Sequence, residues 1–172
     1  MPIISDITQT STLTIQIGAV VIWLGLVFLA SEILHHLKQD PELVRKVVHI
    51  GTGNVDSVVM NKGDVVYAFG TTGNKMSVKL ASNGSDATSA KTVGVVYSSS
   101  IAINGLGFII TQGVCDGLNL GSFTAGDTVY LSSFPGVFTA TKPYAPEHLV
   151  YVGIVERANN GDGLLFVRVQ NG

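Results

Sequence analysis

The chain has 172 residues, of which 46% are apolar and 13% are charged, and its formal net charge is −2. This composition excludes the clustered Lys and Arg that nucleic-acid binding requires, and a single cysteine, Cys115, excludes an intrachain disulfide. The abundant apolar residues exclude a disordered chain, and the length allows one ordinary domain with an appendage.

The first part of the chain is typical of a membrane-spanning segment. No charged residue lies between Asp6 and Glu32, and residues 13–31 are almost wholly apolar. This run has about the length that a helix needs to cross a hydrocarbon core of roughly 30 Å. Lys and Arg occur only after it, which predicts that Met1 is outside and that the following residues are cytoplasmic. The alternative is an apolar helix buried along the axis of an oligomer.

A short amphipathic helix is predicted next. Asp40 suits the N-cap, Pro41 suits the first helical position, and Gly51 and Gly53 are suited to end the helix. Its cationic face would contact lipid headgroups. We therefore predict that residues 1–54 comprise an apolar, transmembrane helix and a short amphipathic helix.

The segment 42–54, ELVRKVVHIGTGN, follows this span directly. It resembles the amino-terminal segment of the phytol kinase family, within the wider group of CTP-dependent polyprenol kinases. The Arg-Lys-x-x-His element of that family matches Arg45, Lys46 and His49. The resemblance implies a position at the cytoplasmic membrane face. The rest of the chain lacks the further spans and the basic nucleotide loop of such kinases, so we expect no kinase activity.

From Val55 onward, short runs of Val, Ile, Tyr, Phe and Thr alternate with Gly, Asn, Asp, Ser and Pro, which predicts β-strands. Three phrases return in the same order: KGDVVY (62–67) as AGDTVY (125–130), VGVV (93–96) as VGIV (152–155), and NGLGFI (104–109), with a two-residue insertion, as NGDGLLFV (160–167). We therefore predict that residues 55–172 form an all-β domain, a small sandwich or barrel. It would contain two copies of a four-strand unit, at about 62–112 and 125–170.

Each predicted copy has one strand after its Gly-Asp turn, followed by three more: 76–81, 92–98 and 106–112 in the first copy, and 137–141, 149–156 and 164–170 in the second. Arg168 should face water, which turns Val167 inward. Applied to both copies, this register predicts one core made of Val66, Val95, Ile109, Val129, Ile154 and Val167. Phe108 and Phe166 would then lie on the opposite face, in a subunit interface or a second core layer.

The repeat region also resembles a module of virion structural proteins of tailed bacteriophages, especially tail-fibre and related appendage proteins. The resemblance is carried by residues 62–67, 123–132, 141–148, 152–157 and 165–172. It implies a non-enzymatic building block that assembles with itself, for example as a trimer, and with other virion proteins.

We predict no catalytic, cofactor-binding or metal-binding residues. Asp64 and Asp127 lie in Gly-Asp turns, and residues 70–75 lack the Gly-Lys-Ser/Thr sequence and following helix of a phosphate loop. His148 and Cys115 do not form a nucleophile–base pair in sequence. His35, His36 and His49 have no recognised metal-ligand spacing. The loops at 82–89 and 159–163 are the expected places for recognition.

Three hypotheses follow. The first is a phage-type structural or attachment module in the virion, tethered or assembled through its amino-terminal helix. The alternative is a truncated or fused membrane protein, derived from a phytol or polyprenol kinase without kinase activity, with its C-terminal domain in the cytoplasm. A third is a fusion of two unrelated segments joined near Val55.

Overall fold

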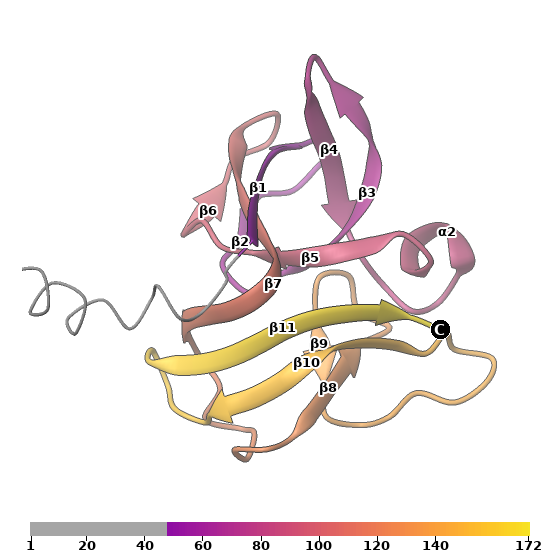
Figure 1. Ribbon diagram of the computed structural model, residues 1–172. Helices are drawn as coiled ribbons and strands as arrows, with labels where there is room; N and C mark the ends of the chain where they lie inside the picture. The colour runs from indigo at the N-terminus through magenta and orange to yellow at the C-terminus, as the bar shows by residue number, and fades with distance from the viewer. Residues whose placement is uncertain (1–47) are drawn as a thin grey trace, which may run out of the picture. The chain divides into compact units, whose positions relative to one another are not determined.

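The computed structural model describes residues 48–172, whose regular secondary structure is almost entirely β-strand (Figure 1). The predicted membrane span, residues 13–31, and most of the predicted amphipathic helix lie outside the described residues. Within residues 48–172, no helix is long and apolar enough to cross a membrane. The elements are β1 (Val48–Asn54), β2 (Met60–Asn61), β3 (Val65–Thr72), β4 (Lys75–Leu80), α2 (Asp86–Ser89), β5 (Thr92–Val96), β6 (Ser100–Ile101), β7 (Leu106–Leu118), β8 (Thr128–Leu131), β9 (Phe138–Thr139), β10 (Val150–Arg157) and β11 (Gly163–Asn171).

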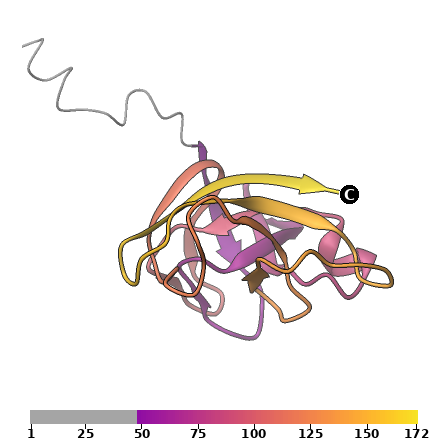
Figure 2. The same ribbon diagram turned by 90° about the horizontal axis from the view of Figure 1, so that it is seen from below.

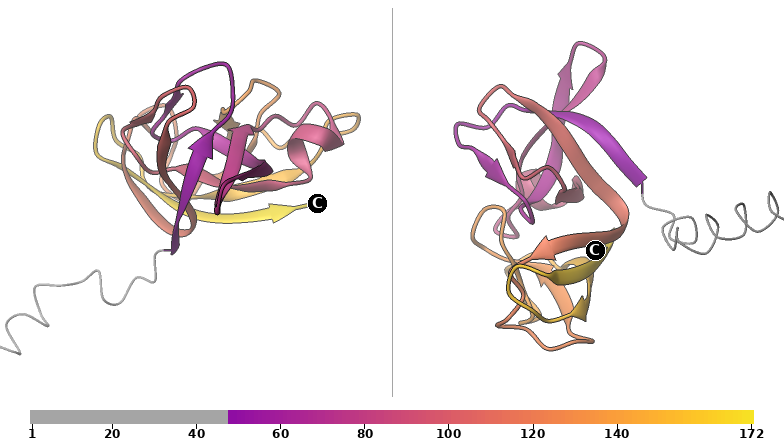
Figure 3. Two further views of the ribbon diagram at one scale, coloured as in Figure 1. Left: turned by 90° about the horizontal axis from the view of Figure 1, so that it is seen from above. Right: turned by 90° about the vertical axis from the view of Figure 1, so that its left-hand side faces the viewer.

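Nine of these strands form one sheet in the order β1-β4-β3-β5-β7-β11-β10-β8-β9. Strands β1 to β7 form one group and β8 to β11 a second group, and the long strand β7 runs from the first to the second (Figures 1 and 3). The short helix α2 and the C-terminus lie at the same end of the body, as the view from below also shows (Figure 2). Each predicted strand is present, although β9 is shorter and β7 longer than predicted.

Strand β1 closes the first group into a ring. It pairs in parallel with β4 and antiparallel with β7, so that β1, β4, β3, β5 and β7 form a closed circuit of hydrogen-bonded strands. The buried Thr52 Oγ1 donates to the Met76 carbonyl at 2.7 Å. The buried Asn54 Nδ2 donates to the carbonyls of Val58 at 2.8 Å and Ile101 at 3.0 Å.

This strand corrects the predicted domain boundary. The β body begins before Val55, because residues 48–54 are a strand paired on both sides rather than the end of an amphipathic helix. Gly51 and Gly53 are not helix terminators. They lie opposite Phe108 and Leu106 in the ladder with β7.

Where they pair with one another, strands β3, β5 and β7 are buried on both faces. Successive residues alternate between two cores, so that Val65, Val95 and Ile110 belong to one cluster while Val66, Val96 and Ile109 belong to the other. The cluster enclosed by the ring contains Met60, Val66, Val78, Val96, Ile101 and Ile109. The second cluster joins the other face of these strands to the strands of the second group, and includes Val129, Val155, Leu165 and Val167.

The two Gly-Asp turns have the same backbone contacts. The N–H of Gly63 donates to the Val96 carbonyl at 2.9 Å, and that of Gly126 donates to the Val155 carbonyl at 2.7 Å. Val66 pairs with Gly94 as Val129 pairs with Gly153. A Cβ atom on Gly94 would lie 2.3 Å from the Ile110 carbonyl oxygen, and one on Gly153 would lie 2.2 Å from the Phe166 carbonyl oxygen.

The predicted single core is wrong, although five of its six residues are buried. Val66 and Ile109 lie in the cluster enclosed by the ring, whereas Val95, Val129 and Val167 lie in the second cluster. Val66, Val95, Ile109, Val129 and Val167 are fully buried, whereas Ile154 is 39% exposed. The counterpart of Ile154, Val95, is covered by the second group of strands. No described element covers the corresponding face of the second group in the same way. Val95 and Ile154 therefore match in the sequence but have different surroundings in the structure.

The predicted equivalence of Phe108 and Phe166 is also wrong. Val95 pairs with Ile110, and Ile154 pairs with Phe166, so Phe166 corresponds to Ile110. The two fourth strands therefore align without the predicted two-residue insertion. Phe108 is 55% exposed, and Phe166 is half-buried.

Removal of β1 should destabilise the body. A chain beginning at Val55 loses the ladders to β4 and β7 and the bonds of Thr52 and Asn54, whereas a chain beginning at Val48 retains them. We expect the shorter chain to be less stable by roughly 3 kcal/mol or more, measured by urea unfolding of both. Equal stability would contradict an integral role for β1.

A carbonyl oxygen of the neighbouring strand lies close to Gly94 and another lies close to Gly153, which gives a second prediction. Gly94→Ala and Gly153→Ala should each destabilise the protein by about 1–3 kcal/mol, because the added methyl group collides with a carbonyl. Gly70→Ala is the matched control, since its Cβ would have nothing within 4 Å. Urea unfolding of the three variants distinguishes the positions, and equal effects would contradict the steric explanation.

Candidate functional site

The two turn aspartates use their carboxylates locally. Asp64 accepts the N–H of Asn61 at 2.7 Å, and Asp127 accepts the N–H of Thr124 at 2.8 Å. Burial raises the pKa of Asp64, although the bond from Asn61 opposes this effect. These contacts close the turns that lead into β3 and β8, which is the role expected of aspartate after glycine.

The structure does not bring the other candidate residues from the sequence together in one site. Residues 73–74 form the turn of the β3–β4 hairpin, so a strand follows the glycine-containing loop. Cys115 lies fully buried on β7 within the second core cluster. Within residues 48–172, no group of three or more His, Cys, Asp or Glu side chains is placed to hold a metal ion.

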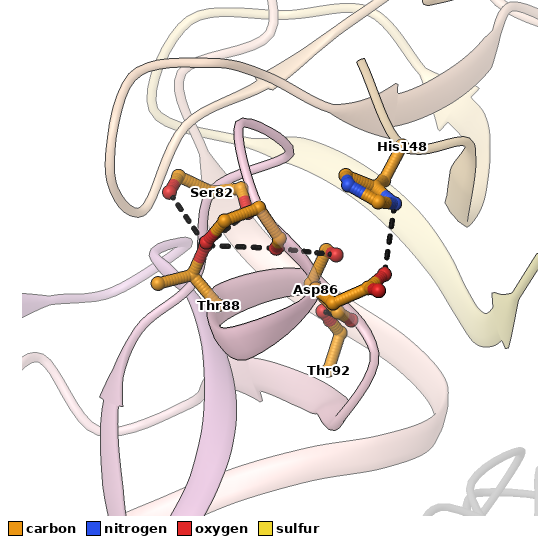
Figure 4. Close-up of polar contacts among 7 residues, drawn as sticks. Ser82, Asp86, Thr88, Thr92 and His148 are labelled. Atoms are coloured by element: carbon orange, nitrogen blue, oxygen red, sulfur yellow. Dashed lines mark hydrogen bonds and ion pairs between the residues drawn. The ribbon is translucent and has the colours of Figure 1, made fainter. Parts of the chain in front are cut away.

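Polar side chains gather around α2, in the loop 82–89 where recognition was expected (Figure 4). Thr88 Oγ1 donates to the Ser82 carbonyl at 2.8 Å, and Ser89 Oγ donates to the Ser85 carbonyl at 2.7 Å. Thr92 Oγ1 donates to the Ser89 carbonyl at 2.7 Å. These bonds fix the loop at the start of β5.

His148 connects this loop to the strands of the second group. Its Nδ1 lies 3.0 Å from Asp86 Oδ1 (Figure 4), and its backbone N–H donates to the Asn83 carbonyl at 2.9 Å. The hydroxyl groups drawn around Thr88 bond to one another and to the backbone of their own loop. The contacts of His148 with Asp86 and Asn83 therefore fasten the loop 82–89 to the segment before β10.

A cleft of about 510 Å³ with polar and apolar residues in its walls opens beside this junction. Its volume falls within the range of small-molecule sites, roughly 300–1,000 Å³. It lies between the loop after β4, the loop after β8 and the segment before β10. Its walls include Asn83, Ser132, Thr139, Thr141, Tyr144 and Glu147.

Asn83 has an unusual environment in the wall of this cleft. Its side chain is 1% exposed, and Nδ2 donates to the Leu131 carbonyl at 2.9 Å and to Glu147 Oε2 at 3.3 Å. Its Oδ1 is buried and accepts no hydrogen bond from the described residues. A buried carbonyl without a donor costs about 1–3 kcal/mol, so such a group calls for a functional or structural explanation.

This site was not predicted from the sequence. Its residues come from two stretches about fifty positions apart, Asn83 and residues 132–147, and only the loop 82–89 had been expected to serve recognition. The second expected loop, 159–163, does not line the cleft.

A second cavity of about 280 Å³ lies next to the first Gly-Asp turn. Lys62, in its wall, forms an ion pair with Asp116 at 2.8 Å and lies 4.9 Å from the centre of the Tyr97 ring. The charge of this lysine is already satisfied by these neighbours. The Asn83 cleft is therefore the better candidate site.

Comparison of the sequence with protein-family models and with curated proteins gave no match. The site must accordingly be interpreted from its own geometry.

Cys115 should be unreactive in the folded protein. Burial, opposed by Lys62 and assisted by Asp116, raises the pKa of the Cys115 thiol to about 12 from 9.0. The thiolate fraction at pH 8 is thus lowered by roughly a thousandfold. Iodoacetamide labelling followed by mass spectrometry should show slow modification of the native chain and rapid modification in urea. Equally fast labelling in both conditions would contradict this burial.

Proposed function

We propose that the chain is a non-enzymatic, homo-oligomeric building block of a tailed-phage virion. Its β body serves as a structural or attachment module with two copies of one strand unit, and its amino-terminal segment, residues 13–31, tethers or assembles it. The resemblance of the repeated phrases to virion structural proteins is the starting point of this proposal.

The matched Gly-Asp turns are the observation that carries the proposal. The phrases that produce the resemblance, residues 62–67 and 125–130, contain these turns and the beginnings of β3 and β8. Val96 donates to the Asp64 carbonyl at 2.8 Å, and Val155 donates to the Asp127 carbonyl at 2.9 Å. The resemblance therefore rests on residues that build the body, which supports a relationship to structural modules rather than a chance similarity of composition.

An exposed apolar surface supports self-association. Leu106 and Phe108 lie two residues apart on β7, and both are more than half exposed. Across the ladder they face Gly51 and Gly53, which have no side chains to cover them. Clusters of exposed apolar side chains mark interaction surfaces more often than isolated ones do, and we assign this one to the contact between copies.

The kinase-derived alternative receives less support. Its motif places His49 beside a membrane on an amphipathic helix, whereas residue 49 lies in β1, paired with β7. A fusion of two segments joined at Val55 is likewise disfavoured, because a junction there would divide the ring of strands.

The proposal predicts the mass of the particle that the purified chain forms in solution. Light scattering of the full chain in detergent, after subtraction of the detergent mass, should give a multiple of 18.1 kDa. Phe108→Ser should shift the population towards monomer, whereas Phe69→Ser, at a similarly exposed phenylalanine on β3, should not.

A monomeric parent chain would contradict the proposed building block, and CTP-dependent phosphorylation of phytol above background would favour the alternative. Neighbouring genes for virion assembly would support the proposed setting.

A further inference from the structure

We propose that the Asn83 cleft binds a neutral saccharide. The inference rests on the proposed function only for its biological role, as a contact with a glycan during attachment. The binding chemistry follows from the residues of the cleft, of which only Asn83 lies in a loop that was expected to serve recognition.

The cleft offers acceptors and donors side by side. Glu147 presents a carboxylate, held by Asn83 Nδ2 at 3.3 Å, next to the unpartnered Oδ1 of the same amide. Ser132 and Thr139 hydroxyls accept the N–H groups of Phe134 and Thr141, at 3.2 and 3.1 Å. Each of these hydroxyls therefore keeps its proton for donation. A sugar hydroxyl both donates and accepts, so it matches such a wall better than a ligand with acceptors alone.

The charges of the cleft favour a neutral ligand. Lys142 and Glu147 both line it, so one positive and one negative side chain face the same volume. A phosphate or sulfate would meet the Glu147 carboxylate, and an organic cation would meet Lys142. The balanced pair favours neither sign.

Tyr144 supplies an apolar surface at the same cleft. Its side chain is 74% exposed, although large aromatic residues usually bury much of their surface on folding. Pro143 and Pro146 lie on either side of it and also line the cleft. An exposed ring beside polar groups can cover the C–H face of a sugar while the hydroxyls bond to the wall.

The buried Oδ1 of Asn83 accepts no hydrogen bond from the described residues. The same side chain belongs to the wall of the cleft and holds the Glu147 carboxylate through Nδ2. A sugar hydroxyl that reached this oxygen would supply the missing donor.

The test uses the full chain in detergent, with glucose, galactose, mannose and N-acetylglucosamine as separate probes in saturation-transfer NMR and titration calorimetry. At least one sugar should bind. Tyr144→Ala should weaken that binding by about tenfold through loss of one aromatic contact, and Glu147→Gln should also weaken it. Phe69→Ala, at an exposed aromatic outside the cleft, should bind like the parent.

Tyr144 and Glu147 are exposed, so both variants should retain the thermal unfolding midpoint of the parent, which is measured in the same samples. Absence of binding by all four sugars would overturn the proposal, as would equal binding by the Tyr144→Ala and Phe69→Ala variants. Oligomer mass is recorded in parallel. An oligomer that binds no sugar overturns only the saccharide site, whereas a monomer that binds sugar overturns only the proposed building block.

Discussion

The burial of the paired segments of β3, β5 and β7 on both faces is the constraint on which the body depends. A strand covered on one side alternates apolar and polar residues, but these strands require apolar side chains at consecutive positions. The pairs Val65–Val66, Val95–Val96 and Ile109–Ile110 satisfy this requirement, one residue of each pair entering each core. Closure of the ring by β1 encloses one core, and the second group of strands covers the other.

The same constraint explains the differences between the two groups of strands. Thr128 occupies the position that corresponds to Val65, and Ile154 the position that corresponds to Val95. The first group needs apolar residues on both faces, whereas the second group needs them only on the face that meets the first. A shared sequence pattern therefore builds two units with different surroundings.

Local signals were sufficient to predict the strands of the two repeats, but not β1, the two-residue strands β2 and β6, or the way in which the strands pack. Gly-Asp turns and runs of β-branched residues located the strands of both groups, because turn chemistry and strand propensity depend on neighbouring residues. Strand β1 was missed since its two glycines and the cationic sequence before it resemble a helix end. The extension of β7 beyond residue 112 was missed because it contains Gly113 and Gly117, and glycines are typical of loops. Both glycines have a positive φ within the strand. The exposure of Ile154 and the convergence of Asn83, Ser132 and Glu147 depend on contacts between distant segments, which no local pattern encodes.

The pairing of β1 on both sides has a mechanical consequence. Residues 1–47 enter the body through this strand, so a load applied to them and directed along β1 acts lengthwise on the ladders with β4 and β7. Hydrogen bonds arranged in this way resist shear together instead of separating one after another. The strand that closes the ring is thus suited to carry tension that reaches the β body at Val48.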